Sequence, residues 1–159
     1  MDVFDKATRS RMMAGVKGRN TKPELLLRRA LHAKGFRFRL HAKGLAGRPD
    51  IVLKRRRAIV FVHGCFWHRH EGCRFASTPA TRQEFWTTKF AANVLRDSAV
   101  QAELAASGWR IGIVWECALR KPQMAEEAVE RLGNWLCSER PWLELGEMDL
   151  RPFRFWESG

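Results

Sequence analysis

The sequence predicts a single α/β domain in which a mixed sheet is flanked by helices. A length of 159 residues suits one domain, and a 45% hydrophobic content is enough to build a core. Short apolar runs typical of strands alternate along the chain with longer segments of helical periodicity. The predicted order is one helix, three strands, a helix, a strand and a helix, which favours helices packed on a sheet.

The first half of the chain carries the first helix and three strands. Residues 21–24 (TKPE) form a capping-box pattern before a leucine-rich run, and Gly35 ends the predicted helix. Phe36 and Phe38 alternate with arginines, which favours a strand with one wet face. Residues 44–49 read as a loop, 51–53 as a short strand, 54–57 as a charged turn and 58–62 as a buried strand.

In the second half, an irregular segment at 63–80 precedes two further helices and a strand. Residues 81–84 (TRQE) are a second capping-box pattern, and we expect a helix from there to about Ser107, stopped by Gly108. Residues 110–115 (RIGIVW) predict a strand, and residues 123–137 predict an amphipathic helix. The pattern does not place the segment after Ser138.

The charge of the chain predicts a polyanionic partner. Lys and Arg number 29 against 17 Asp and Glu, a net charge of +12, and neutralising phosphates releases counterions. Residues 5–20 are polar and basic, and we interpret them as an arm or a short helix. No stretch approaches the roughly 18 apolar residues that span a bilayer, and residues 1–6 lack a signal-peptide core. We therefore expect a cytoplasmic protein with no membrane contact, in which cysteines are thiols or metal ligands.

Asp50 is the first candidate for chemistry. Residues 47–50 (GRPD) place this carboxylate at the junction of a loop and a strand, where it would be held rigidly. Mg²⁺ prefers one or two carboxylates together with water and phosphate oxygens, so Asp50 suits a magnesium site at a phosphodiester. The alternative is an ordinary Pro-Asp turn. Glu24 is a second acid, although its position in the capping box already accounts for it.

A cluster of cysteine and histidine predicts a structural zinc site. Cys65, His70 and Cys73 follow the spacing C-x4-H-x2-C, and Cys117, just after the predicted strand 110–115, is a candidate fourth ligand. The alternative is chance clustering in a His-rich loop. Cys137 lies in the last predicted helix, and we interpret it as a core thiol.

Two histidines remain beside this cluster. His63 ends a buried strand, and His68 lies in the Cys/His loop. An imidazole that titrates near neutral pH can activate water as a general base. A spare zinc ligand or a solvent-facing histidine explains the same residues equally well.

Aromatic residues flank the Cys/His loop. Phe66, Trp67 and Trp86, beside Arg69, Arg74 and Arg82, suit stacking on bases or wedging into a duplex if they are exposed. Core packing is the alternative, and it fits Trp109, Trp115 and Trp135 better because they follow strand or helix patterns.

Eight segments of the chain, in order, resemble one family, the very short patch repair (Vsr) endonucleases. The resemblance covers roughly residues 5–137. The segments are 5–10 (DKATRS), 47–50 (GRPD), 63–68 (HGCFWH), 79–82 (PATR), 84–86 (EFW), 93–94 (NV), 96–97 (RD) and 114–120 (VWECALR).

The resemblance implies a restriction-endonuclease-like core with a structural zinc site. It implies Mg²⁺-dependent nicking of one strand of double-stranded DNA, 5′ to the thymine of a T·G mismatch produced by deamination of 5-methylcytosine. It further implies a bacterial, nucleoid-associated monomer whose partners include mismatch-repair proteins of the MutL type. By position, residues 1–20 would be a DNA-contacting arm, 21–137 the endonuclease domain and 138–159 a tail of unknown role.

The resemblance also implies roles for individual residues. Asp50 would bind Mg²⁺ together with the backbone carbonyl of Val62, His68 would be the general base, and His63 and Glu24 would support catalysis. Cys65, His70, Cys73 and Cys117 would hold Zn²⁺. The residues implied to contact DNA are Phe66, Trp67, Trp86, Met13, Lys89, Asn93 and Asp97.

Three positions depart from related patterns. Residues 61–63 (FVH) lack the acid and lysine of ordinary restriction-type nucleases, Val62 stands where many relatives carry threonine, and the loop between His70 and Cys73 is one residue longer. Two other functions also fit the sequence: a non-catalytic, zinc-stabilised DNA-binding module, and a nuclease of the same core that cuts another DNA structure.

Overall fold

The computed structural model describes residues 20–150. Almost all of the predicted basic arm, including Met13, and residues 151–159 lie outside the described part. Within it, β1 (Arg39–Leu40), β2 (Ile51–Leu53), β3 (Ala58–His63), β4 (Arg110–Trp115) and β5 (Trp142–Leu145) form one sheet in the order β1-β2-β3-β4-β5. The first two pairings are antiparallel and the last two are parallel, so the predicted mixed sheet is confirmed.

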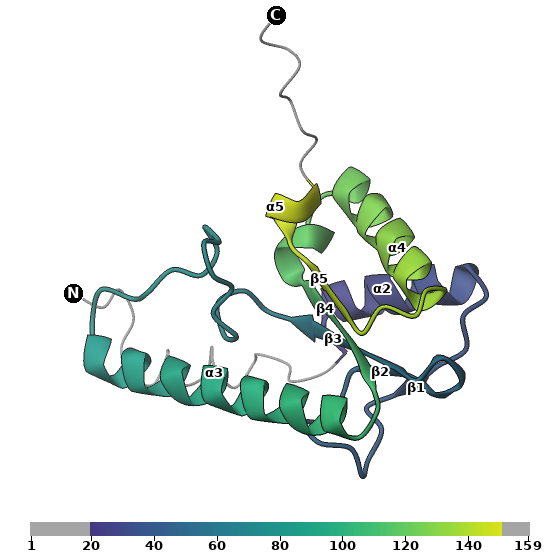
Figure 1. The fold of residues 1–159 in the computed structure, drawn as a ribbon. Helices are drawn as coiled ribbons and strands as arrows, with labels where there is room; N and C mark the ends of the chain where they lie inside the picture. The colour runs from purple at the N-terminus through teal and green to yellow at the C-terminus, as the bar shows by residue number, and fades with distance from the viewer. Residues whose placement is uncertain (1–19, 151–159) are drawn as a thin grey trace, which may run out of the picture.

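Helices cover both faces of this sheet (Figure 1). The helices α2 (Lys22–Ala33) and α4 (Pro122–Leu136) pack on one face, and α3 (Gln83–Ala106) packs on the other. The strand residues alternate accordingly, as period-2 side chains must. Val60 joins Leu27 and Trp135 in one apolar cluster, whereas its neighbour Ile59 joins Leu104 in the opposite one.

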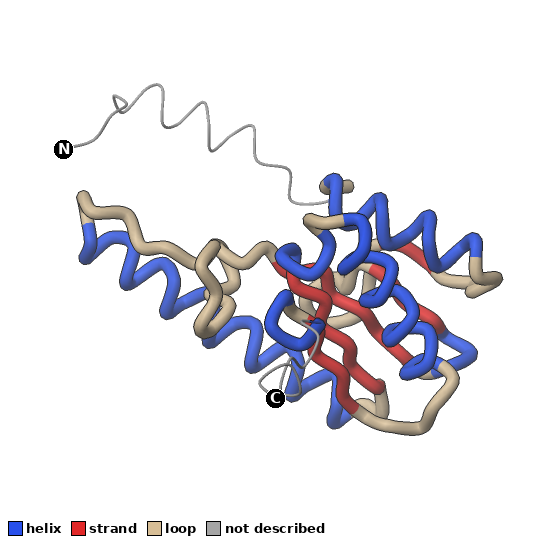
Figure 2. Tube along the Cα trace, turned by 90° about the horizontal axis from the view of Figure 1, so that it is seen from above, coloured by secondary structure: helices blue, strands red, loops and turns tan. Residues whose placement is uncertain are grey.

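Helix α3 extends well beyond the sheet. Its 24 residues make a rod about 36 Å long at ~1.5 Å per residue. Only its C-terminal part, with Leu104, packs under the strands. The irregular segment 64–82 runs beside the N-terminal half in both views (Figures 1 and 2). This loop and this half of α3 form a lobe next to the end of β3.

Several predicted elements agree with the structure in type and position. The strand over 110–115 is confirmed at both ends, and β2 matches 51–53. Strand β3 continues one residue beyond the prediction, to His63. The first helix begins after the N-cap residue Thr21, whose backbone N–H lies 3.3 Å from Oε2 of Glu24, as the capping box requires.

Three local predictions were wrong. Phe36 and Phe38 precede the strand, because Phe36 folds back from the end of α2 to pack in the α2–α4 core. The N-cap of α3 is Arg82 in a left-handed conformation, φ 54°, so Thr81 does not start the helix. Cys137 is exposed, because it caps the C-terminus of α4 where the chain leaves the core.

The segment that the sequence pattern did not place adds two elements. Strand β5 pairs with β4, and α5 (Glu147–Leu150) follows it after Gly146. The two leucines of β5, Leu143 and Leu145, face the α2–α4 core, and Leu150 joins them. Their two-residue spacing is a strand signal that is too short to stand out in the sequence. Among the described residues, none of the helices combines the length and apolarity that crossing a membrane would require.

Candidate active site and metal centre

Asp50 lies where β2 begins and β3 ends. Because β2 and β3 are antiparallel, with Ile51 opposite Val60, the start of one strand meets the end of the other. The backbone N–H of Val62 donates to Oδ2 of Asp50 at 2.7 Å, which fixes the carboxylate beside His63. The expected rigid carboxylate at a strand edge is therefore present.

The protein raises the pKa of Asp50 from 3.8 to about 7. Burial is the main cause, because the charged carboxylate is hydrated less well in this position than in water, and the charge of Glu24 adds to it. The hydrogen bond from Val62 and the positive charges of His68 and Arg28 act in the opposite direction. A carboxylate whose charge is this costly is well suited to binding a cation, which removes the cost.

Glu24 lies next to Asp50 and is almost fully buried, with 2% of its surface exposed. Its Oε1 lies 2.6 Å from Nη2 of Arg28 and 2.9 Å from Nε2 of His41. The capping box and these two contacts act through different oxygens, so Glu24 both caps α2 and turns a carboxylate oxygen toward the site. The ligand atoms of Glu24, His41 and Asp50 all lie within 4.8 Å of one another.

A second group combines His63, His68 and Asp97. The two imidazoles stack with centroids 3.9 Å apart and planes 6° apart. Nδ1 of His68 lies 2.7 Å from Oδ2 of Asp97, which comes from α3. Burial lowers the pKa of His63 to about 3, and the neighbouring charge of His68 adds to this, so His63 is neutral at physiological pH. His68 is held against a neutral ring by a carboxylate.

The two groups lie at the same edge of the sheet. His63 is the last residue of β3, next to Val62, which holds Asp50, and the charge of His68 is close enough to lower the pKa of Asp50. This arrangement places a candidate cation ligand and a candidate general base at one edge of the sheet. It can support hydrolysis of a phosphodiester.

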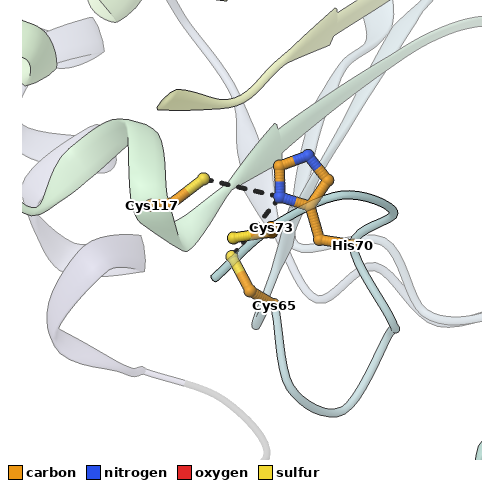
Figure 3. A group of neighbouring side chains, drawn as sticks. All are labelled: Cys65, His70, Cys73 and Cys117. Atoms are coloured by element: carbon orange, nitrogen blue, oxygen red, sulfur yellow. Dashed lines mark hydrogen bonds between the residues drawn. The ribbon is translucent and has the colours of Figure 1, made fainter. Parts of the chain in front are cut away.

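The predicted zinc ligands also converge. Figure 3 shows Cys65, His70 and Cys73, all from the loop 64–82, facing Cys117 from the 3₁₀ turn after β4. Their ligand atoms lie within 4.8 Å of one another, with Nδ1 of His70 3.7 Å from Sγ of Cys65 and 3.5 Å from Sγ of Cys117. Three thiols and one imidazole form a donor set that suits Zn²⁺, so the cluster could hold a metal ion.

The surroundings of the cluster favour thiolate at Cys117. A hydrogen bond from Cys65 lowers the pKa of Cys117 to about 6, and the backbone N–H of Glu147, 3.1 Å from Sγ, acts in the same direction. The same hydrogen bond and burial raise the pKa of Cys65. His70 stacks on Trp115 at 4.2 Å. The site thereby fastens the loop to β4 and to the start of α5.

Comparison with known proteins identifies the family. The family model described as DNA mismatch endonuclease Vsr matches residues 1–74. The protein named DNA mismatch endonuclease Vsr from Escherichia coli (strain K12) is 46% identical over 140 residues, which cover 87% of this chain and 89% of that protein. The chain belongs to the Vsr family. The resemblance inferred from the sequence is therefore confirmed.

Two nicking enzymes are also similar to the chain. The type II nicking enzyme V.XorIIP from Xanthomonas oryzae pv. oryzae (strain KACC10331 / KXO85) is 50% identical over 118 residues, covering 74% of this chain and 86% of its own. The type II nicking enzyme V.NmeAIP from Neisseria meningitidis serogroup A / serotype 4A (strain DSM 15465 / Z2491) is 38% identical over 131 residues, covering 82% and 93%.

The aromatic residues that the Vsr resemblance assigns to DNA pack together in this structure. Phe66 contacts Trp67 and Trp86 edge-on at 5.0 and 5.7 Å, and Phe90 completes the group. Trp86 is buried, with 7% exposed, which agrees with the core-packing alternative for this residue. The physical reason is that the loop 64–82 packs over the first turns of α3. Phe66 and Trp67 are half-buried.

Arg69 ties the loop 64–82 to itself and to α3. Arg69 donates to the backbone oxygens of Phe66, Ala76 and Ser77, and its guanidinium lies 3.9 Å from the centroid of the Phe90 ring. These contacts fasten the loop to itself through the backbone oxygens and to α3 through Phe90.

The other described positions that the Vsr resemblance assigns to DNA, Lys89, Asn93 and Asp97, lie on α3, facing the loop or partly exposed. Asn93 donates from Nδ2 to the backbone oxygen of Trp67 at 3.1 Å, and Lys89 is half-buried. Sequence reasoning missed Arg28 and His41. The spacing of Arg28 four residues after Glu24 is an ion-pair signal on a helix, whereas His41 lies in a turn with no local pattern to indicate a role.

Proposed function

We propose that this protein is a strand-specific DNA mismatch endonuclease that nicks 5′ to the thymine of a T·G mismatch. Membership of the Vsr family supports the class of reaction. The observation that carries the mechanism is the meeting of Asp50 with the His68–Asp97 pair at one edge of the sheet. T·G mismatches that arise by deamination of 5-methylcytosine would be the substrates.

The residues around Asp50 fit a catalytic Mg²⁺ ion. Asp50 would be the principal ligand, with the backbone carbonyl of Val62 and the carboxylate of Glu24 near it. When bound, the ion would neutralise charge that develops on the scissile phosphate. The raised pKa of Asp50 supports this role, because a cation favours the charged carboxylate that burial disfavours.

His68 is proposed as the general base. In this role Nδ1–H of His68 donates a 2.7 Å hydrogen bond to Oδ2 of Asp97, which leaves the lone pair on Nε2 to take a proton from water. The buried, neutral His63 stacks on His68 and keeps the ring in one plane without adding a competing charge. His68 is 33% exposed, so water has access to it.

Zn²⁺, held by Cys65, His70, Cys73 and Cys117, is proposed as a structural ion. The loop that supplies three of these ligands also carries His68, two residues before His70. A metal ion that fastens the loop to β4 therefore also fixes the distance of the base from Asp50. A restriction-endonuclease-like core is part of the same proposal; its endonuclease domain, assigned to residues 21–137, is completed by β5 and α5.

DNA binding is assigned to the positive charge and to the aromatic lobe. A net charge of +12 suits a duplex. Insertion of Phe66, Trp67 and Trp86 beside the mismatch would require the aromatic group to repack on DNA. Met13 with the arm 1–20, Lys89, Asn93 and Asp97 would contact the surrounding DNA. We further propose that the protein acts as a monomer in the bacterial cytoplasm, at the nucleoid, and cooperates with repair proteins of the MutL type.

The test is a nicking assay with the cut position mapped. Matched duplexes carrying a T·G mismatch, a T·A pair or a flap are incubated with Mg²⁺ and the wild type, Asp50→Asn or Glu126→Gln, an exposed control on α4. The proposal predicts one nick, 5′ to the mismatched thymine, that only Asp50→Asn abolishes while DNA binding persists. A cut flap with an intact T·G duplex would indicate another substrate. DNA binding without nicking by any variant, the wild type included, would indicate a binding module.

A further inference from the structure

His41 lies beside the proposed cation site but has no assigned role. It follows β1, and its backbone N–H donates to the backbone oxygen of Asp50 at 3.3 Å. This bond aligns the turn that carries His41 with the start of β2. The imidazole is only 17% exposed and lies with the carboxylates of Glu24 and Asp50 in a group whose ligand atoms are within 4.8 Å of one another. Three chain segments thus bring together one nitrogen atom and two carboxylate oxygens that could bind a metal ion.

Nη2 of Arg28 lies among these potential metal-ligand atoms. Nη2 of Arg28 lies 2.6 Å from Oε1 of Glu24, 2.8 Å from Nε2 of His41 and 2.7 Å from Oδ1 of Asn20. Nη2 carries two protons and meets three potential acceptors. The pocket is arranged around a positive charge, and in this structure Arg28 supplies it.

The protons of His41 and Arg28 cannot satisfy all of these contacts. If Nε2 of His41 carries a proton, it donates a hydrogen bond to Glu24 at 2.9 Å. Its 2.8 Å contact with Nη2 of Arg28 then brings two hydrogen-bond donors together with no acceptor between them. If Nε2 is unprotonated, its lone pair faces the carboxylate oxygen of Glu24. A metal ion bound between the nitrogen and the oxygen needs no proton, and it would leave Arg28 bonded to Asn20.

We propose that His41 binds the catalytic cation directly through Nε2, together with Asp50 and Glu24, and that it makes the site prefer a first-row transition ion such as Mn²⁺ over Mg²⁺. Mg²⁺ favours oxygen ligands and water, whereas imidazole nitrogen suits transition metals. This inference assumes one part of the proposed function, namely that the catalytic cation binds at Asp50.

The test measures Mn²⁺ coordination rather than activity. Pulsed electron paramagnetic resonance of Mn²⁺ bound to the zinc-loaded protein detects ¹⁴N coupling from a coordinated imidazole. His41→Asn removes the ring and suits the backbone, because His41 has φ 45° and asparagine tolerates that region. His32→Asn, exposed in the last turn of α2, is the matched control. Thermal melting checks that each variant is folded, and His41→Gln provides a second removal of the ring.

The expected result is ¹⁴N coupling in the wild type and in His32→Asn that disappears in His41→Asn. The Kd for Mn²⁺ should rise about tenfold or more in His41→Asn, as loss of metal-site residues commonly costs, while the Kd for Mg²⁺ changes much less. Bound Mn²⁺ without ¹⁴N coupling, or with coupling that persists in both folded His41 variants, would overturn the inference and leave the proposed function standing. Mn²⁺ binding that is absent, or indifferent to Asp50→Asn, would overturn both.

Discussion

Replacing Asp50 with asparagine should stabilise the metal-free protein at alkaline pH. The folded protein raises the pKa of Asp50 from 3.8 to about 7, so the folded state holds this proton more tightly than the unfolded chain does. Stability is therefore lost as pH rises from about 4 to 7. The difference between the two pKa values corresponds to about 4 kcal/mol above pH 7, as an upper figure for a half-buried group. An asparagine side chain would avoid this loss, and its oxygen can still accept from the backbone N–H of Val62.

Urea unfolding measures this effect directly. The wild type, Asp50→Asn and the control Glu126→Gln are compared at several pH values between about 4 and 8.5, with zinc retained and without magnesium. We expect Asp50→Asn to exceed the wild type by several kcal/mol at the alkaline end of this range, and the gap to close toward the acidic end. Added Mg²⁺ should stabilise the wild type and leave Asp50→Asn unchanged. Equal stability at alkaline pH, or a gap that does not vary with pH, would refute the assigned burial of this charge.

Three other substitutions test the remaining parts of the site. Asp97→Asn should slow nicking by about 10²-fold or more at saturating DNA, because His68 loses its orienting carboxylate, and an unchanged rate in single-turnover assays would contradict this. Elemental analysis should find about one Zn²⁺ per chain in the wild type and in the control Cys137→Ser, but less in Cys117→Ser. The melting temperature of Cys117→Ser should also fall. Full zinc content in Cys117→Ser would disprove the role of Cys117 as a ligand. Gly146→Ala should weaken zinc retention against a chelator, because its Cβ would lie 2.5 Å from Cε1 of His70, and wild-type retention would show that the ring is free to move.

The parts of the fold that were predictable have a strong local pattern. Strand 110–115 is a run of β-forming residues after Gly108, and the predicted strand and the observed β4 coincide. The Cys/His cluster was recognisable because thiol and imidazole side chains with fixed spacing have few uses other than metal binding. Cys117 was a reasonable fourth ligand because it follows a strand end, and the parallel pairing of β4 with β3 is what brings it to the loop.

The parts that were not predictable depend on contacts between distant segments. His41 approaches Glu24 only because β1 pairs with β2, and no pattern in its own turn indicates this. Whether Trp86 is exposed depends on how the loop 64–82 packs, since Phe66 and Phe90 cover it. Cys137 looked like a core residue beside Leu136, but a helix that ends one residue earlier releases it to the surface.

The Cys/His cluster and the proposed active site share one loop, so the proposal links stability to catalysis. The backbone N–H of His68 donates to the backbone oxygen of Gly64 and that of His70 donates to the backbone oxygen of Cys65, so the proposed base and a proposed zinc ligand belong to consecutive turns. Loss of the metal would therefore move His68 as well as loosen the loop. The stacking of His70 on Trp115 orients this ligand and should strengthen the link.

The central claim is that Asp50 and His68 act together on one phosphodiester. The most direct measurement is the single-turnover nicking rate of wild type, Asp50→Asn and His68→Ala on one T·G duplex in Mg²⁺, with every variant saturated by DNA. The account predicts a rate lower by about 10²-fold or more in each variant, with DNA affinity preserved. Wild-type nicking rates in either variant would contradict it.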